Sequence, residues 1–199
     1  MKNVIGFDLR KGVIRDYGAS CRNSYLEEFW SFGHDLFLDT PETFPAGFIA
    51  GDVFDASMIV PHAPFYTPPS NAPPGLRSLT SLTPLQGQVS AMFVGAFFHL
   101  FDEAKQLQVA QQVASLLSPL PGSIIFGSHV SMLVNGMRKR FQGDEAFCHS
   151  PESWKELWDG IVLEKGMVSV ETSAKLIDEN PSKGMDDKLI WMSWSVTRL

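Results

Sequence analysis

Two aspartates stand at comparable places in this chain, each beside a short apolar run. Asp8 ends the run Val4–Phe7, and Asp52 lies past the middle of the run Phe48–Val53. A carboxylate at the carboxyl end of a parallel strand can accept both hydrogen bonds of a ribose diol, and an acid one strand away can accept from an adenine amine. The alternative is that strand-end acids are common and are solvated or cap the next helix. For Asp8 taken alone, this second interpretation is favoured.

Two histidines follow predicted buried strands and are the candidate proton-handling groups. His99 stands between Phe98 and Leu100, and His129 follows the pair Gly127-Ser128. An imidazole facing a cleft can act as a base near neutral pH. A histidine between strongly apolar neighbours is more often packed and bonded to the backbone, so a structural role is favoured for His99.

Three phenylalanines surround His99 in the sequence. Phe97, Phe98 and Phe101 could flank an adenine ring or a sulfonium cation, although at such a density at least two of them are expected in the core. The sequence contains no Gly-x-Ser-x-Gly nucleophile motif, no phosphate-binding glycine-rich loop and no zinc-binding histidine pair. No metal site is therefore predicted.

The elements that position these residues form one strand–helix–strand unit. The apolar run that begins at Ser90 leads into an amphipathic helix, which Asp102 caps and which ends near Leu117. Ser123–Phe126 is the second apolar strand, and Gly127 to His129 are its predicted exit. Right-handed crossover connections place two such strands in a parallel sheet, where ligands bind at the carboxyl ends.

The remaining segments complete an α/β pattern. Residues 24–31 predict a helix that stops before a glycine, and residues 60–87 hold seven of the chain's thirteen prolines and predict a long loop. A second helix begins after the cap residue Ser150, and its apolar face is expected to pack on the sheet. Alternating segments at 167–176 and 188–199 predict an antiparallel hairpin at the sheet edge.

Composition narrows the classes of protein. A chain of 199 residues with 44% hydrophobic content predicts one domain spanning residues 1–199, including the proline-rich loop. The net charge of −6 makes nucleic acid an unexpected partner. Two distant cysteines fit a reducing compartment, and no apolar run approaches membrane-spanning length, so we expect a cytoplasmic protein without a membrane partner.

Four segments together resemble a known family. The order Val4–Leu9, Gly51–Asp55, Phe97–Glu103 and Pro121–Gly127 is similar to the class I S-adenosylmethionine-dependent methyltransferases, and most similar to the fungal branch of meroterpenoid and related secondary-metabolite pathways. The resemblance extends over Val4–Leu199. It implies a Rossmann-like α/β sheet, mostly parallel, with an antiparallel C-terminal hairpin.

The resemblance also assigns roles. It implies S-adenosylmethionine as cofactor, with Asp8 on the ribose hydroxyls and Asp52 near the adenine. The implied reaction is methyl transfer to an oxygen or carboxyl of a small hydrophobic metabolite, with His99 or His129 as base where the acceptor is protonated. The residues it places at the cofactor are Asp8, Asp52, Val53, Phe97 and Phe98.

One departure from the family stands out. The family's sheet begins with a strand and a glycine-rich turn, whereas this sequence has no Gly-x-Gly before Asp8. We therefore expect an N-terminally truncated version of the sheet. The alternative function is a cofactor-free relative that acts through interactions or has no catalytic role.

Overall fold

The structure is a computed structural model, and it describes residues 4–8, 22–40, 42–43, 46–72, 75–139, 145–177 and 189–199. The chain divides into two compact units, one of residues 1–60 with 71–85 and the other of residues 61–70 with 86–199. A compact unit is not by itself a domain, so the single domain expected from the sequence stays a prediction.

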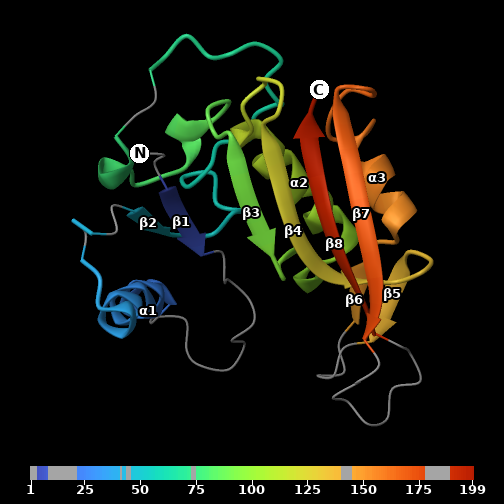
Figure 1. Ribbon diagram of the computed structural model, residues 1–199, viewed down its shortest axis with the longest axis horizontal. Coiled ribbons are helices and arrows are strands. Elements are labelled where there is room, and N and C mark those ends of the chain that lie inside the picture. Colours follow the sequence, from blue (N-terminus) through green and yellow to red (C-terminus); the bar gives the residue numbers. More distant parts are fainter. Residues whose placement is uncertain are drawn as a thin grey trace. The chain divides into compact units, whose positions relative to one another are not determined.

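The first unit contains a parallel pair of strands. β1 (Val4–Asp8) pairs in parallel with β2 (Ala46–Ala50), and the two strands are labelled in Figure 1. In the register of the pair, Asp8 lies opposite Ala50. Both strands were predicted, but β2 ends before Asp52 instead of reaching Val53. The reason is local: the Asp52 carboxylate accepts the N–H of Phe54 at 3.1 Å, and this turn replaces the strand ladder.

The helix α1 (Arg22–Phe37) extends further than the sequence suggested. It continues past Gly33, because one glycine costs a helix only about 1 kcal/mol and packing can offset that. Trp30 stacks on Phe48 of β2 with ring centroids 4.9 Å apart and planes within 9°, which fixes the helix to the strand pair. The helix ends at Phe37, and the positive φ of 53° at the next residue, Leu38, turns the chain away.

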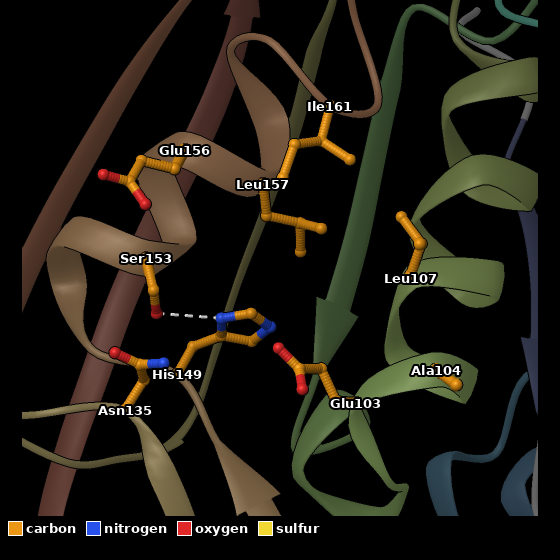
Figure 2. Close-up of a pocket in the computed structure, with 9 residues that line it drawn as sticks. All are labelled: Glu103, Ala104, Leu107, Asn135, His149, Ser153, Glu156, Leu157 and Ile161. Atoms are coloured by element: carbon orange, nitrogen blue, oxygen red, sulfur yellow. Dashed lines mark hydrogen bonds between the residues drawn. The ribbon is translucent and has the colours of Figure 1, made fainter.

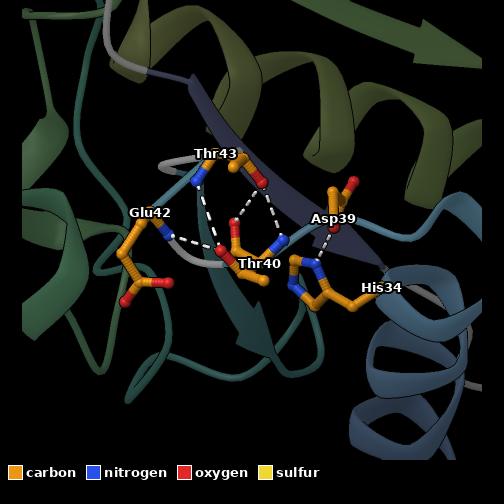
Figure 3. Close-up of polar contacts among 5 residues, drawn as sticks. All are labelled: His34, Asp39, Thr40, Glu42 and Thr43. Atoms are coloured by element: carbon orange, nitrogen blue, oxygen red, sulfur yellow. Dashed lines mark hydrogen bonds and ion pairs between the residues drawn. The ribbon is translucent and has the colours of Figure 1, made fainter.

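A compact set of polar contacts follows α1 and leads toward β2 (Figure 3). The Asp39 N–H donates to the carbonyl of His34 at 3.2 Å, and the Asp39 carboxylate pairs with the His34 ring. Further on, the Thr40 N–H donates to Oγ1 of Thr43 at 2.8 Å, and Thr43 returns a bond to the Thr40 carbonyl at 3.2 Å. These bonds satisfy backbone groups in a segment outside any helix or strand.

The second unit contains a four-stranded sheet in the order β3-β4-β8-β7. Its strands are β3 (Ala91–Gly95), β4 (Ile124–Ser131), β7 (Val168–Ile177) and β8 (Leu189–Arg198). β3 and β4 are parallel, and β8 is antiparallel to both β4 and β7, so β3, β4 and β7 run the same way. The mostly parallel sheet and its antiparallel C-terminal hairpin are confirmed.

Two helices lie against one face of this sheet (Figure 1). α2 (Glu103–Leu116) is capped by the Asp102 carboxylate, which accepts the Lys105 N–H at 2.8 Å. α3 (Pro151–Trp158) begins with a capping box between Ser150 and Ser153. Both starts were predicted from these cap residues. α3 ends at Trp158, so Ile161 lies beyond the helix and is 62% exposed.

The strand β4 continues through residues predicted to be its exit. Gly127 pairs with Val94 of β3, and a Cβ atom at Gly127 would overlap the Val94 carbonyl oxygen. The glycine therefore permits close approach of two backbones and does not mark a turn. As a result His129 lies inside the strand, opposite Met192 of β8.

Short elements complete the described chain. A hairpin of β5 (Gly136–Lys139) and β6 (Glu145–Cys148) was not predicted. Three short 3-10 helices are η1 (Leu76–Ser78), η2 (Thr83–Leu85) and η3 (Phe98–Leu100). None of the helices in the described ranges is long and apolar enough to cross a membrane.

Part of the proline-rich segment is attached to the second unit. The buried Arg198 donates to the Phe65 carbonyl at 2.8 Å and stands 5.2 Å from the centre of the Tyr66 ring. The Tyr66 hydroxyl accepts the N–H of Glu164 at 2.9 Å. These contacts hold residues 65–66 of the predicted loop in place.

Candidate functional site

The two acids singled out in the sequence lie at the same edge of the β1–β2 pair. Asp8 is the last residue of β1, and Asp52 follows the end of β2 by two residues. Paired strands are about 4.8 Å apart, so the two backbones are close at this edge. The structure describes the backbone of Asp8, and its side chain lies outside the described part.

The turn after β2 positions the Asp52 carboxylate. Its Oδ1 accepts the Phe54 N–H, and its backbone carbonyl accepts the Asp55 N–H at 3.0 Å. Val53, the other candidate here, is 3% exposed, so its side chain belongs to the core and only its backbone could meet a ligand. The chain passes close to Met58 at Gly51, where a Cβ would overlap that side chain.

In the second unit, the turn after β3 carries the predicted aromatic contacts. Ala96 has a positive φ of 52°, and its N–H donates to the Ser128 carbonyl at 2.7 Å. The turn sends Phe97 inward, where its ring contacts Phe101 edge-on with centroids 5.0 Å apart. Phe97 is 8% exposed, which leaves little of its ring for a cofactor.

Phe98 is fully enclosed by what we term the aromatic cluster. Its centroid is 4.9 Å from that of Trp154 in edge contact, and Trp154 is 4.9 Å from Trp194. Phe98 is 0% exposed, so the cluster covers its whole side chain, and its predicted contact with the cofactor stays a prediction. The members of the cluster are Phe98, His129, Trp154, Trp158 and Trp194.

His129 is a buried member of this cluster. It is 2% exposed, and its Nδ1 accepts the indole N–H of Trp194 at 3.0 Å, which places the ring proton on Nε2. Burial, followed by the charges of His99 and His149, lowers the pKa of His129 to about 3. This environment favours a structural role for His129 over its predicted role as a base.

His99 occupies a different environment from His129. It lies in η3, directly after the β3 turn, and is only partly buried. Its ring is in edge contact with Trp191 at 6.2 Å. Of the two predicted bases, His99 is the one that keeps access to solvent at the carboxyl end of a parallel strand.

A pocket of about 410 Å³ lies in the second unit, between α2 and α3 (Figure 2). The buried His149 stands in its wall, at the end of β6, and its Nδ1 is 2.9 Å from Oγ of Ser153. Burial lowers the pKa of His149 to about 4. The residues around the pocket are Glu103, Ala104, Leu107, Asn135, His149, Ser153, Glu156, Leu157 and Ile161.

Sequence reasoning missed this pocket. His149 precedes the recognised cap Ser150, which was the available signal, but the β5–β6 hairpin that carries it to α2 was not predicted. Within the described ranges, no three histidine, cysteine, aspartate or glutamate side chains lie close enough together to hold a metal ion.

Comparison with known proteins relates the chain to fungal methyltransferases. It is 30% identical over 151 residues to "O-methyltransferase phiE" of Fungal sp. (strain ATCC 74256). The matched region covers 75% of this chain and 42% of that protein. It is 26% identical over 194 residues to "Methyltransferase trt5" of Aspergillus terreus, covering 92% of this chain and 60% of that protein. The chain thus spans about half the length of these relatives. No protein-family profile matches it.

Among solved structures, the chain is similar to a Burkholderia thailandensis 1,6-didemethyltoxoflavin-N1-methyltransferase with bound 1,6-didemethyltoxoflavin and S-adenosylhomocysteine. The TM-score is 0.46 at 9% sequence identity, and the match covers 99% of this chain and 72% of the other.

Proposed function

This chain is homologous to the class I S-adenosylmethionine-dependent methyltransferases of fungal secondary metabolism, and from that premise we propose that it is part of such an enzyme. The proposed reaction is transfer of a methyl group to an oxygen or carboxyl of a small hydrophobic metabolite. The proposed partner is thus a small molecule.

The observation that carries the proposal is the pair of acids at one edge of the β1–β2 pair. Asp8 ends one parallel strand and Asp52 follows its neighbour, whose last residue is opposite Asp8. Carboxylates there supply acceptors for the two hydroxyls of a ribose and for an adenine amine. The chemistry of the acceptors therefore fits the adenosine part of the cofactor.

In such an enzyme the cofactor and the protein chain make different contributions to the reaction. S-adenosylmethionine, when bound, supplies a methyl group on a positively charged sulfur. The chain would contribute orientation of the acceptor and, where the acceptor carries a proton, a base to receive it. We assign that base to His99, because it is partly exposed at the end of β3 whereas His129 is sealed.

Calorimetric titration of the 199-residue chain with S-adenosylmethionine tests the proposal. Asp8→Asn should weaken binding about ten- to a hundredfold, since a hydrogen bond to a charged group contributes about 1.5–3 kcal/mol. Asp35→Asn is the matched control, because it removes the same charge from an exposed position of α1 in the same unit. This variant should bind S-adenosylmethionine as tightly as the original chain does.

Two results would count against the proposal in different ways. Absence of both heat and thermal shift with S-adenosylmethionine would support the cofactor-free alternative for this chain. Equal binding by Asp8→Asn and Asp35→Asn would leave a cofactor site but remove Asp8 from it.

A further inference from the structure

We propose that the pocket between α2 and α3 binds an uncharged, largely apolar small molecule, held by a hydroxyl group that donates a hydrogen bond to Nε2 of His149. This inference concerns a site other than the β1–β2 edge. It needs no cofactor, so it stands or falls separately from the proposed methyl transfer.

Apolar side chains line part of the pocket and can contact the apolar part of a ligand. Leu107 of α2 faces Leu157 of α3 and the nearby Ile161 across the space (Figure 2). The volume of about 410 Å³ falls within the range of small-molecule sites, which are mostly apolar with a few placed polar groups. Removing apolar ligand surface from water against these side chains would supply most of the binding free energy.

The contacts of the Ser153 hydroxyl favour one tautomer of His149. Its Oγ accepts the Ser150 N–H at 2.9 Å, is 3.3 Å from the Ser150 carbonyl, and is 2.9 Å from Nδ1 of His149. One hydroxyl hydrogen cannot serve both the carbonyl and the ring. All three bonds form together only if the hydroxyl donates to the carbonyl and Nδ1–H donates to Oγ. Nε2 is then an acceptor.

The Nε2 atom of His149 is buried and has no hydrogen-bond partner among the described residues. The His149 residue is 5% exposed, and the Nε2 side of its ring points into the space between Leu107 and Leu157 (Figure 2). Its lowered pKa keeps the ring neutral near pH 7. A buried acceptor without a donor costs roughly 1–3 kcal/mol, and a ligand hydroxyl would remove that cost.

The charges near the pocket select against an anionic ligand. Glu103 and Glu156 line the pocket and are exposed to solvent, so they repel a carboxylate, and their solvation weakens any attraction to a cation. The other polar lining residues, Asn135, His149 and Ser153, are neutral and replace little of a cation's hydration. The lining of the pocket therefore favours an uncharged compound that carries a hydroxyl group.

Titration of the full chain with three probes of one shape tests the proposal. The probes are 2-naphthol, naphthalene and 2-naphthoate, followed by nitrogen NMR of the His149 ring. We expect 2-naphthol to bind about three- to tenfold more tightly than naphthalene, the ratio of one net hydrogen bond, and to shift the Nε2 resonance. The carboxylate should bind more weakly than either.

Two variants with a matched control separate the site from the fold. His149→Phe should remove the preference for 2-naphthol over naphthalene. Ala104→Phe fills the pocket from an exposed position of α2 and should reduce 2-naphthol binding at least about tenfold, while Gln108→Phe adds the same ring to α2 away from the lining and should not.

Equal affinity of the original chain for 2-naphthol and naphthalene would overturn the hydroxyl contact. Unchanged 2-naphthol binding in Ala104→Phe would overturn the location, even if His149→Phe failed to fold. Tightest binding by 2-naphthoate would overturn the ligand class. Titration of Ala104→Phe with S-adenosylmethionine reports separately on the cofactor site.

Discussion

Two histidines of the second unit pack against the same tryptophan, yet they occupy opposite environments. The Trp154 ring centroid is 4.6 Å from that of His129 and 5.3 Å from that of His149, both in edge contact. His129 lies inside the aromatic cluster and accepts from Trp194 through Nδ1. His149 stands in the pocket wall, and its Nδ1–H donates to Ser153 Oγ in the tautomer that leaves Nε2 as an acceptor.

The difference shows that burial and function are separate properties of a histidine. Burial lowers the pKa of both rings, to about 3 for His129 and to about 4 for His149. The two histidines differ in the element that carries them. His129 lies inside β4 between two neighbouring strands, whereas His149 lies between the end of β6 and the start of α3. Both Nε2 atoms are buried without a hydrogen-bond partner among the described residues, but only His149 is a residue that lines the pocket.

Removal of Trp154 should have the largest effect, because this buried ring packs against both His129 and His149. Trp154→Ala should lower the free energy of unfolding by about 3–5 kcal/mol, measured by urea denaturation. Ile161→Ala, at a pocket residue that is 62% exposed, should change it by less than about 0.5 kcal/mol. Similar losses in the two variants would show that Trp154 is not a core residue.

Removal of the His129 ring tests the sealed environment. His129→Leu keeps most of the volume but leaves the buried Trp194 N–H without its acceptor, so we expect a loss of about 1–3 kcal/mol in the free energy of unfolding. The exposed His62 provides a control, since His62→Leu should be neutral within about 0.5 kcal/mol. A neutral His129→Leu would contradict the structural role.

Acid should destabilise the chain through both rings, over different ranges of pH. Their folded pKa values lie below the unfolded value of 6.5, so the unfolded state takes up protons first as the pH falls. The free energy of unfolding should therefore decrease below pH 6.5, approaching about 1.4 kcal/mol per pH unit for each ring. As the pH falls further, the loss of stability due to His149 should level off near pH 4 and the loss due to His129 near pH 3, where each folded ring becomes protonated as well.

Denaturation at a series of pH values, compared between the original chain and the variants His129→Leu and His149→Phe, isolates these contributions. The comparison cancels the pH dependence that the three chains share. Each variant should have a shallower pH dependence than the original chain, and an identical slope in all three would contradict the folded pKa values.

The smallest effect should come from the Ser153 hydroxyl, which acts on His149 and leaves His129 alone. Ser153→Ala removes one half of the capping box and should lower the free energy of unfolding by about 0.5–1 kcal/mol. It should also shift the ring nitrogens of His149 in NMR spectra, without shifting those of His129. Ser153→Thr keeps a hydroxyl and should preserve the original His149 spectrum; a shift equal to that of Ser153→Ala would contradict the assigned contact.

Local signals predicted much of the second unit. Asp102 and Ser150 were recognised as helix caps, and their side chains make the expected backbone bonds. The parallel strands around α2 and the C-terminal hairpin followed from apolar runs and alternation. At the other end of the chain, the strand positions beside Asp8 and Asp52 were also predicted, within about three residues.

The sequence by itself determined the helices, the main strands and the edge where the two acids stand, because caps, apolar periods and turn residues act over a few positions. Only the tertiary structure decided which histidine is sealed and which faces a pocket. Trp194 reaches His129 across 65 positions of the chain, and the pocket needs α2, α3 and the β5–β6 hairpin together. Such contacts depend on packing between distant segments, which no local pattern encodes.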